Sequence, residues 1–211
     1  MMRPSARHLG AVNRQLDQLM PSDVHPYETF ELPPIYTLVA HPPDQIQNNI
    51  RVFSKELSAK LSSDDYYYAA PQLHTTLQYI GTKINDNTLP TLRTILKGRQ
   101  IAVTAYGVGV NSRGVAVPVY DQSNGVLRLR EELRSALDIS TNYTEHNKIW
   151  EELMWVSFTR FKRPPSQATL QTIREYRDRY IGSYAIQQWQ LYKTSSRVLD
   201  PKKSELIEVF I

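Results

Sequence analysis

The chain has 211 residues, of which 41% are hydrophobic and 22% charged, the proportions of an ordinary globular protein with a sizeable core. It contains no cysteine, which excludes disulfide bonds, a thiolate nucleophile and Cys-ligated zinc, and fits a reducing compartment. Its net charge of +4 permits a phosphate-bearing partner without requiring one, and the absence of long Lys/Arg runs argues against a protein that coats duplex nucleic acid.

Nothing in the sequence indicates a membrane or secreted protein. No apolar run approaches the roughly 20 residues that cross a bilayer, and the first residues lack the apolar core of a signal peptide. We read Asn142-Tyr143-Thr144, which matches a glycosylation acceptor, as a chance match. We therefore expect a cytoplasmic protein without membrane contacts, and take a monomer as the default.

The first 33 residues look like an extension. A helix is predicted over about Ala6 to Met20, and Pro21 ends it. Prolines make the segment that follows extended. We expect residues 1–33 to be this extension and residues 34–211 to form one domain; His8 and His25 receive no role.

The rest of the chain alternates strands and helices. Strand-to-helix periodicity predicts the order β-α-β-α-β-β-α-β-α-β-β, which is typical of an α+β fold with mainly antiparallel sheets. His41, directly after the first strand, reads as a turn residue before Pro42-Pro43. The predicted strands cover 35–40, 73–81, 101–110, 115–120, 153–161, 184–193 and 205–211, and the helices 45–61, 89–96, 124–137 and 166–180.

Two strands carry chemistry-bearing side chains. In Leu73 to Gly81, alternation places His74, Thr76, Gln78 and Ile80 on one face, so an imidazole that titrates near neutral pH and a hydroxyl reach the same small group. In the second strand, 153–161, alternation places a large aromatic and two hydroxyls on one face; these are Trp155, Ser157 and Thr159. Arg160 has the opposite parity from Ser157, so a β-bulge is needed to bring it to the same face.

These motifs resemble those of the two-histidine phosphoesterases, in particular the 2′-5′ RNA ligase and cyclic phosphodiesterase branch. The first His-x-Thr motif is His74 to Thr76; the second position lies 81 residues later, ends in Ser157 and is followed by Arg160. The resemblance covers about residue 34 to the end. It implies a two-lobed α+β fold, with two antiparallel sheets that face a central cleft and helices packed outside.

The resemblance implies a metal-independent reaction without a cofactor. In the family, a 2′,3′-cyclic phosphate or 2′-5′ phosphodiester lies between two imidazoles, one acting as general base and the other as general acid, and the hydroxyls hold the phosphoryl oxygens. This implies catalytic roles for His74, Thr76 and Ser157, and substrate contacts by Trp155 and Arg160. The chain departs from the pattern at the second histidine, which is Trp155, and an indole has no proton to exchange near pH 7.

Several functions stay open. The protein is a phosphodiesterase or RNA ligase-like enzyme with an impaired acid/base pair, or a module that binds nucleotides or RNA ends in the same cleft, or its resemblance is architectural only. Trp155 is either a stacking platform for a base or part of the core. His146, Glu151 and Glu152 are candidates for a second proton-transfer group by proximity alone. A protein-interaction module that docks through the N-terminal helix is the alternative from another class.

Overall fold

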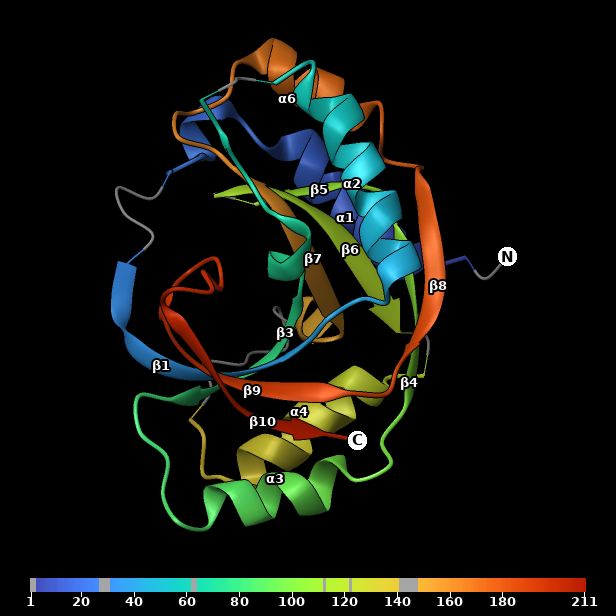
Figure 1. Cartoon of the computed structure of the whole chain (residues 1–211). Coiled ribbons are helices and arrows are strands. Elements are labelled where there is room, and N and C mark those ends of the chain that lie inside the picture. The colour runs from blue at the N-terminus through green and yellow to red at the C-terminus, as the bar shows by residue number, and fades with distance from the viewer. Residues whose placement is uncertain (1–2, 27–30, 62–63, 112, 122, 141–147) are drawn as a thin grey trace.

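One strongly curved antiparallel sheet forms the centre of the molecule (Figure 1). The computed structural model describes residues 3–26, 31–61, 64–111, 113–121, 123–140 and 148–211. The strands run in the order β10-β9-β1-β3-β7-β6-β4-β8, with β2 paired to β7 and β5 to β6. The strands are β1 Glu31–Ala40, β2 Tyr66–Tyr67, β3 Thr75–Gly81, β4 Ile101–Tyr106, β5 Gly109–Asn111, β6 Gly114–Asp121, β7 Leu153–Arg160, β8 Tyr180–Ile186, β9 Trp189–Ser196 and β10 Ser204–Phe210.

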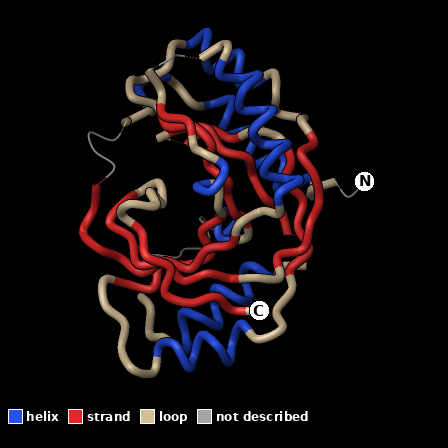
Figure 2. The backbone as a smooth tube through the Cα atoms, in the orientation of Figure 1, coloured by secondary structure: helices blue, strands red, loops and turns tan. Residues whose placement is uncertain are grey.

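Helices cover the outside of this sheet (Figures 1 and 2). α3 and α4 lie beneath the half made of β10, β9, β1 and β3, and α2 and α6 lie above the half made of β7, β6, β4 and β8. We call the side of the sheet that these four helices cover the outer face and the opposite side the inner face. The α-helices are α1 Ala6–Gln18, α2 Asp44–Ser58, α3 Thr88–Leu96, α4 Gly125–Ala136, α5 Lys148–Glu151 and α6 Gln167–Arg174.

The α+β antiparallel fold expected from the sequence is confirmed. The two expected sheets are, however, hydrogen-bonded into one within the described residues. The junction between the halves is narrow: β3 and β7 share the single pair Thr75 and Val156. Arg130 of α4 reinforces it, because its buried guanidinium donates to the carbonyls of Leu77 on one strand and Leu153 on the other, at 2.8 and 3.0 Å.

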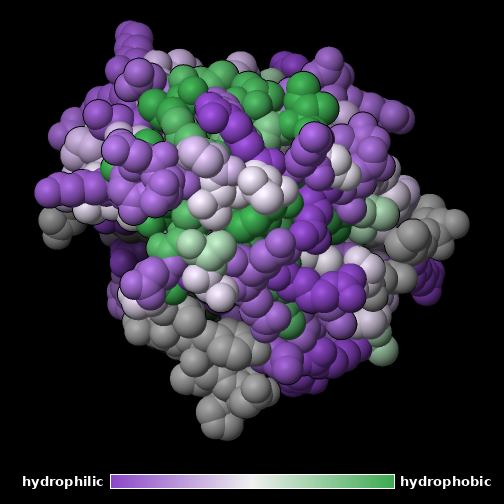
Figure 3. Space-filling model, turned by 90° about the horizontal axis from the view of Figure 1, so that it is seen from below, coloured by the Kyte–Doolittle hydropathy of each residue, from purple (hydrophilic) through white to green (hydrophobic). Residues whose placement is uncertain are grey.

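Amphipathic helices build the core of the outer face. In α2, apolar residues at helical spacing point at the sheet; Ile46, Ile50, Phe53 and Leu57 are all at most 4% exposed. The start of α4 is fixed by Asp121, whose carboxylate accepts the Val126 N–H at 2.8 Å. Seen from below, the surface combines hydrophilic residues with apolar patches, the broadest of them along one edge of the view (Figure 3).

The N-terminal helix packs against the body of the protein. Val12 is 2% exposed, and it clusters with Tyr106, Tyr120 and Leu153 on the inner face of the second half. Arg174 of α6 donates to the carbonyls of Leu16, Asp17 and Leu19 at the C-terminal end of α1. The apolar side of α1 is therefore occupied within the chain, which disfavours the alternative that this helix docks a partner protein.

Several boundaries differ from the sequence prediction: the expected strand 101–110 is two strands, β4 and β5, and the strand expected from Ile35 begins at Glu31. The expected strand 184–193 is two strands, β8 and β9, which lie in opposite halves of the sheet. The alternation of buried and exposed residues is interrupted at the break, where two exposed residues, Gln187 and Gln188, separate buried Ile186 from buried Trp189. The expected helix 166–180 ends at Arg174, and the chain then turns into β8. No helix among the described residues is both long and apolar enough to span a bilayer.

Candidate functional site

The register of β3 and β7 brings the two sequence motifs together on the inner face. Thr75 pairs with Val156, so Thr76 lies across from Trp155 and His74 across from Ser157. Directly opposite residues of an antiparallel pair point to the same side. The four motif positions therefore form one group on the inner face, with each histidine position across from the hydroxyl of the other motif.

A β-bulge changes which side chains at the end of β3 point to the inner face, compared with the sequence prediction. Consecutive residues Leu38 and Val39 of β1 pair with Gln78 and Thr76, so Leu77 is an extra residue. The bulge reverses the alternation after Thr76. Gln78 was expected beside His74, but its amide accepts from Arg134 on the outer face at 3.0 Å, while Tyr79 joins the histidine side.

A second bulge brings Arg160 toward the site. On β7, Ser157 pairs with Ala116 and Thr159 with the next residue, Val115, so Phe158 is unpaired and turns into the core. The bulge that the sequence required for Arg160 is present, and Arg160 lines the same pocket as His74 and Thr76. Its Nε donates to the Tyr68 hydroxyl at 3.0 Å, which fixes the guanidinium.

The pocket around His74 has a volume of about 430 Å³, within the usual range for small-molecule sites. It lies across β3, β1 and β9 with Arg160 at one flank. Two arginines and several hydroxyls line it beside apolar residues, and its described lining contains no carboxylate. The lining residues are Leu32, Pro33, Ile35, Thr37, His74, Thr76, Tyr79, Thr82, Arg160, Thr194, Ser196, Arg197 and Leu199.

The His74 ring is fixed in one tautomer. Its Nδ1 lies 2.7 Å from the carbonyl oxygen of Gln72. A carbonyl only accepts, so Nδ1 carries the proton and Nε2 keeps its lone pair. Burial lowers the pKa of His74 to about 4, and repulsion from the protonated form of His41 and from the Arg160 guanidinium adds to this effect. At neutral pH the side chain is therefore a neutral imidazole, with Nε2 able to accept a proton.

His41 is the residue that the sequence analysis missed. It follows Ala40, which pairs with Thr75, so it lies beside His74, and the ring centroids are 6.2 Å apart. Its Nδ1 is 2.9 Å from the Leu73 carbonyl oxygen, and burial lowers its pKa. Its Nε2 is buried without a hydrogen-bond partner in the described structure. The available signal was the pairing of two strands whose ends both carry a histidine.

A buried hydroxyl opens onto the pocket. Thr37 of β1 lines it, is 3% exposed, and has no hydrogen-bond partner for its Oγ1 in the described part of the chain. An unpaired buried hydroxyl costs about 1–3 kcal/mol, and a ligand oxygen is one way to satisfy it. Thr37 therefore adds a polar contact beside Thr76.

Trp155 points along the inner face, away from the His74 pocket. Its ring lies against Gly109 of β5 so closely that a Cβ there would approach its Cζ3 to 2.3 Å. Trp150 packs beside it, with ring centroids 6.2 Å apart. Trp155 and Ser157 are half-buried, and neither is among the residues that line the pocket. The indole of Trp155 therefore packs onto a glycine of β5.

The other candidates for a second proton donor have partners elsewhere or are not described. The Glu151 carboxylate pairs with Arg134 at 2.6 Å. Glu152 is 3% exposed and pairs with His8 at 2.6 Å and Arg7 at 2.9 Å. His146, like Asn142-Tyr143-Thr144, lies outside the described residues. Within the described ranges, no group of three or more His, Cys, Asp or Glu could hold a metal ion.

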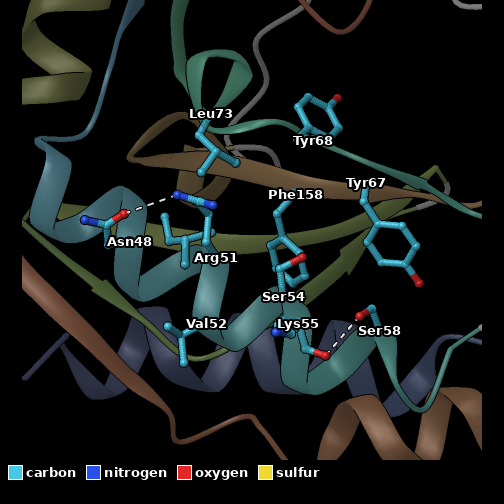
Figure 4. Close-up of a pocket in the computed structure, with 11 residues that line it drawn as sticks. Asn48, Arg51, Val52, Ser54, Lys55, Ser58, Tyr67, Tyr68, Leu73 and Phe158 are labelled. Atoms are coloured by element: carbon cyan, nitrogen blue, oxygen red, sulfur yellow. Dashed lines mark hydrogen bonds between the residues drawn. The ribbon is translucent and has the colours of Figure 1, made fainter.

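A separate pocket of about 520 Å³ lies between α2 and the segment from β2 to Leu73 (Figure 4). Arg51 and Lys55 lie on one side of it and Tyr67 on the other. It has no imidazole in its described lining, so it offers no group that exchanges protons near pH 7. The acid/base chemistry of the described residues is concentrated in the His74 pocket.

Comparison with known proteins supports the fold. No protein-family model matches the chain, and no curated protein matches it. Among solved structures, E. coli LigT, a 2′-5′ RNA ligase, in complex with 3′-AMP has 18% identity and a TM-score of 0.55. Its ATP complex has 18% identity and a TM-score of 0.54; each match covers 85% of this chain and 98% of LigT. TT0787 of Thermus thermophilus has 15% identity and a TM-score of 0.59, covering 83% and 96% of the two chains.

These matches define the class of architecture. The chain has the fold of the LigT-like two-histidine phosphoesterases, which confirms the resemblance seen in the sequence at the level of fold. At such low identity the matches establish the fold alone, and the chemistry has to be argued from this chain's own residues.

Proposed function

We propose that this protein binds 2′,3′-cyclic phosphate or 2′-5′ phosphodiester groups of nucleotides or RNA ends, and hydrolyses them slowly without a metal or cofactor. One observation carries the proposal: His74 presents an Nε2 lone pair in a pocket that also holds Thr76 and Arg160 and has no carboxylate in its described lining. That set matches an anionic phosphoryl group in charge and hydrogen bonding.

The roles follow from the chemistry of each side chain. His74 Nε2 takes the proton of the attacking water as the water oxygen bonds to phosphorus and a bond from phosphorus to ribose oxygen breaks. The Thr76 hydroxyl donates to a phosphoryl oxygen, Ser157 adds a hydroxyl from its position across from His74 at the edge of the pocket, and Arg160 stabilises the phosphoryl charge. Trp155 donates no proton, so the leaving oxygen is protonated by solvent. Each general acid or base contributes about 10²–10⁴-fold, so the rate is expected to fall below that of a two-histidine site by that order.

Binding without turnover is the second candidate function. The indole at position 155 and the engaged Glu151 and Glu152 favour it, because they leave His74 without a described acid partner. In this case the pocket binds phosphorylated nucleotide ends without cleaving them.

A hydrolysis assay tests the proposal. The substrates are a nucleoside 2′,3′-cyclic phosphate and a 2′-5′ linked dinucleotide, with EDTA present throughout. We expect turnover that falls at least about 100-fold in His74→Ala and is unchanged in His25→Ala, a control at an exposed histidine. Turnover that persists in His74→Ala would refute the site. If the unmodified protein shows no turnover but binds these substrates, and His74→Ala abolishes that binding, the second candidate function is supported.

A further inference from the structure

The His74 pocket has a second cationic flank on the far side of β1. Arg160 ends β7 and Arg197 directly follows β9, and both line the pocket. In the sheet, β3 and β1 lie between β7 and β9. Neighbouring strands are about 4.8 Å apart, so the backbones of β7 and β9 are separated by roughly 14 Å along the sheet. The two arginines therefore reach the pocket from strands that are not neighbours, so each can face an anion of its own.

The loop that carries Arg197 is held in a defined shape. Val198 and Leu199 are buried, 3% and 7% exposed, while Arg197 between them and β9 is exposed. The Ser196 hydroxyl accepts the Val198 N–H at 3.3 Å, and Thr194 Oγ1 lies 2.7 Å from the Ser204 hydroxyl across the hairpin. These two consecutive buried side chains anchor the loop directly after Arg197, so the backbone position of Arg197 is set before a ligand arrives.

Backbone strain marks the same loop. Leu199 has φ of +46°, a left-handed conformation that costs a residue with a Cβ about 1–2 kcal/mol. Such strain persists where the surroundings hold it in place, and it concentrates at binding sites. Here it allows Leu199 to turn inward and line the pocket beside Ser196 and Arg197.

The floor between the two arginines is apolar and suits a flat group. Leu32, Pro33 and Ile35 of β1 line this part of the pocket. A nucleoside placed over these residues would have its 3′ end toward His74 and its 5′ end toward Arg197. The pocket thus offers an anion site, an apolar middle and a second anion site in sequence.

We propose that the pocket recognises a nucleotide by two anionic groups: a phosphoryl group at His74, Thr76 and Arg160, and the 5′-phosphate of the same nucleotide at Ser196 and Arg197. This inference rests on the proposed function and narrows its substrate class. The preferred ligand is then a terminal nucleotide that carries a phosphate on both sides of its ribose, as the last nucleotide of an RNA strand does, and a nucleoside cyclic phosphate alone is a poor ligand.

Calorimetric binding of two stable probes tests this inference without relying on turnover. Adenosine 3′-phosphate and adenosine 3′,5′-bisphosphate differ only in the 5′-phosphate. We expect the full-length protein to bind the bisphosphate at least about 10-fold more tightly, since Arg–phosphate hydrogen bonds are charge-assisted. Arg197→Gln should remove the preference and leave the affinity for adenosine 3′-phosphate within about two-fold.

Lys202→Gln is the matched control, because it removes one positive charge from an exposed residue of the same hairpin. It should keep most of the preference; a loss equal to that of Arg197→Gln would refute a specific contact and leave only general charge attraction. Equal binding of both probes by the unmodified protein would overturn the second anion site and leave the proposed function standing. Failure to bind either probe would overturn both.

Discussion

His41 and His74 lie side by side on neighbouring strands, with ring centroids 6.2 Å apart, and each presents its Nδ1 to a backbone carbonyl oxygen. Each imidazole is therefore held as the Nδ1–H tautomer, with the lone pair on Nε2. The chain thus has two adjacent histidines in one half of the sheet, at the ends of β1 and β3. A second proton on this pair is disfavoured, because each cation repels the other.

This relationship predicts the titration of His74. His41→Gln removes the neighbouring imidazole, whose protonated form repels a proton on His74, and keeps a side-chain donor for the Leu73 carbonyl. Because His41 lowers the pKa of His74, the variant should titrate His74 at a higher pH, still below 6.5 because burial is the larger cause. NMR titration of the His74 ring measures this. His25→Gln is the control, and an unchanged titration in His41→Gln would contradict the coupling.

The same pKa values predict acid sensitivity. His74 titrates at about 4 when folded and near 6.5 when unfolded, so below pH 6.5 the unfolded chain binds the proton first. The free energy of unfolding should therefore fall as pH drops from 6.5 to about 4, by up to about 1.4 kcal/mol per pH unit from this group. His41, whose pKa is also lowered, acts in the same direction. Urea unfolding at several pH values should show a shallower fall in His74→Gln; identical slopes would refute the assignment.

Restoring an imidazole on β7 should increase the rate. Position 155 lies across from Thr76 on the face that bears His74. If a histidine there protonates the leaving oxygen, Trp155→His should hydrolyse a nucleoside 2′,3′-cyclic phosphate at least about 10-fold faster, a fraction of the usual general-acid contribution. Trp155→Phe, which cannot donate a proton, is the control. No gain in a folded Trp155→His protein would count against the site.

Trp155 and Gly109 should be energetically coupled. A Cβ at position 109 would meet the indole at 2.3 Å, so Gly109→Ala should lower the free energy of unfolding by about 1–3 kcal/mol. In a Trp155→Ala background the same change should cost less, because the space above it is vacant. A double-mutant cycle in urea measures this coupling, expected at about 0.5–3 kcal/mol, and strict additivity would contradict the packing.

Arg130 should matter for both stability and activity. It donates to Leu77 and Leu153 across the β3–β7 junction, next to Thr76. Arg130→Met leaves these carbonyls without their charged donor, so we expect a loss of about 2–4 kcal/mol in unfolding free energy and a higher KM. Arg128→Met is the matched control, since Arg128 donates to the Ser123 carbonyl at an exposed site of the same helix. Equal effects of the two changes would show that the Arg130 hydrogen bonds across the β3–β7 junction make no particular contribution to stability or activity.

Most of the fold could be predicted because its signals are local. The spacing of Ile46, Ile50, Phe53 and Leu57 predicts α2, and His74 with Thr76 marks the central strand. The order of elements then leads to the α+β antiparallel class. These patterns depend only on residues a few positions apart, so no long-range contact had to be known.

The arrangement around the site depends on pairing between distant segments. The bulge at Leu77 moves Gln78 out and Tyr79 in, and it arises only from the register with β1. His41 joins His74 because of the same pairing. The position of Trp155 depends on Gly109, which lies 46 positions earlier. Because glycine has no side chain, no sequence pattern indicates this contact. The catalytic, binding and domain assignments made from sequence stay predictions until the assays above are performed.

The close contact between the Trp155 indole and Gly109 constrains the order in which amino-acid substitutions at these two positions can occur. A larger residue at 109 collides with the indole, while a smaller residue at 155 only leaves space, so any substitution path toward an imidazole on β7 must begin at 155. The reverse path must begin at 109, because a tryptophan fits only after that position has lost its Cβ. An indole at 155 and a Cβ at 109 therefore exclude each other, so the residue at either position limits which residues the other can hold.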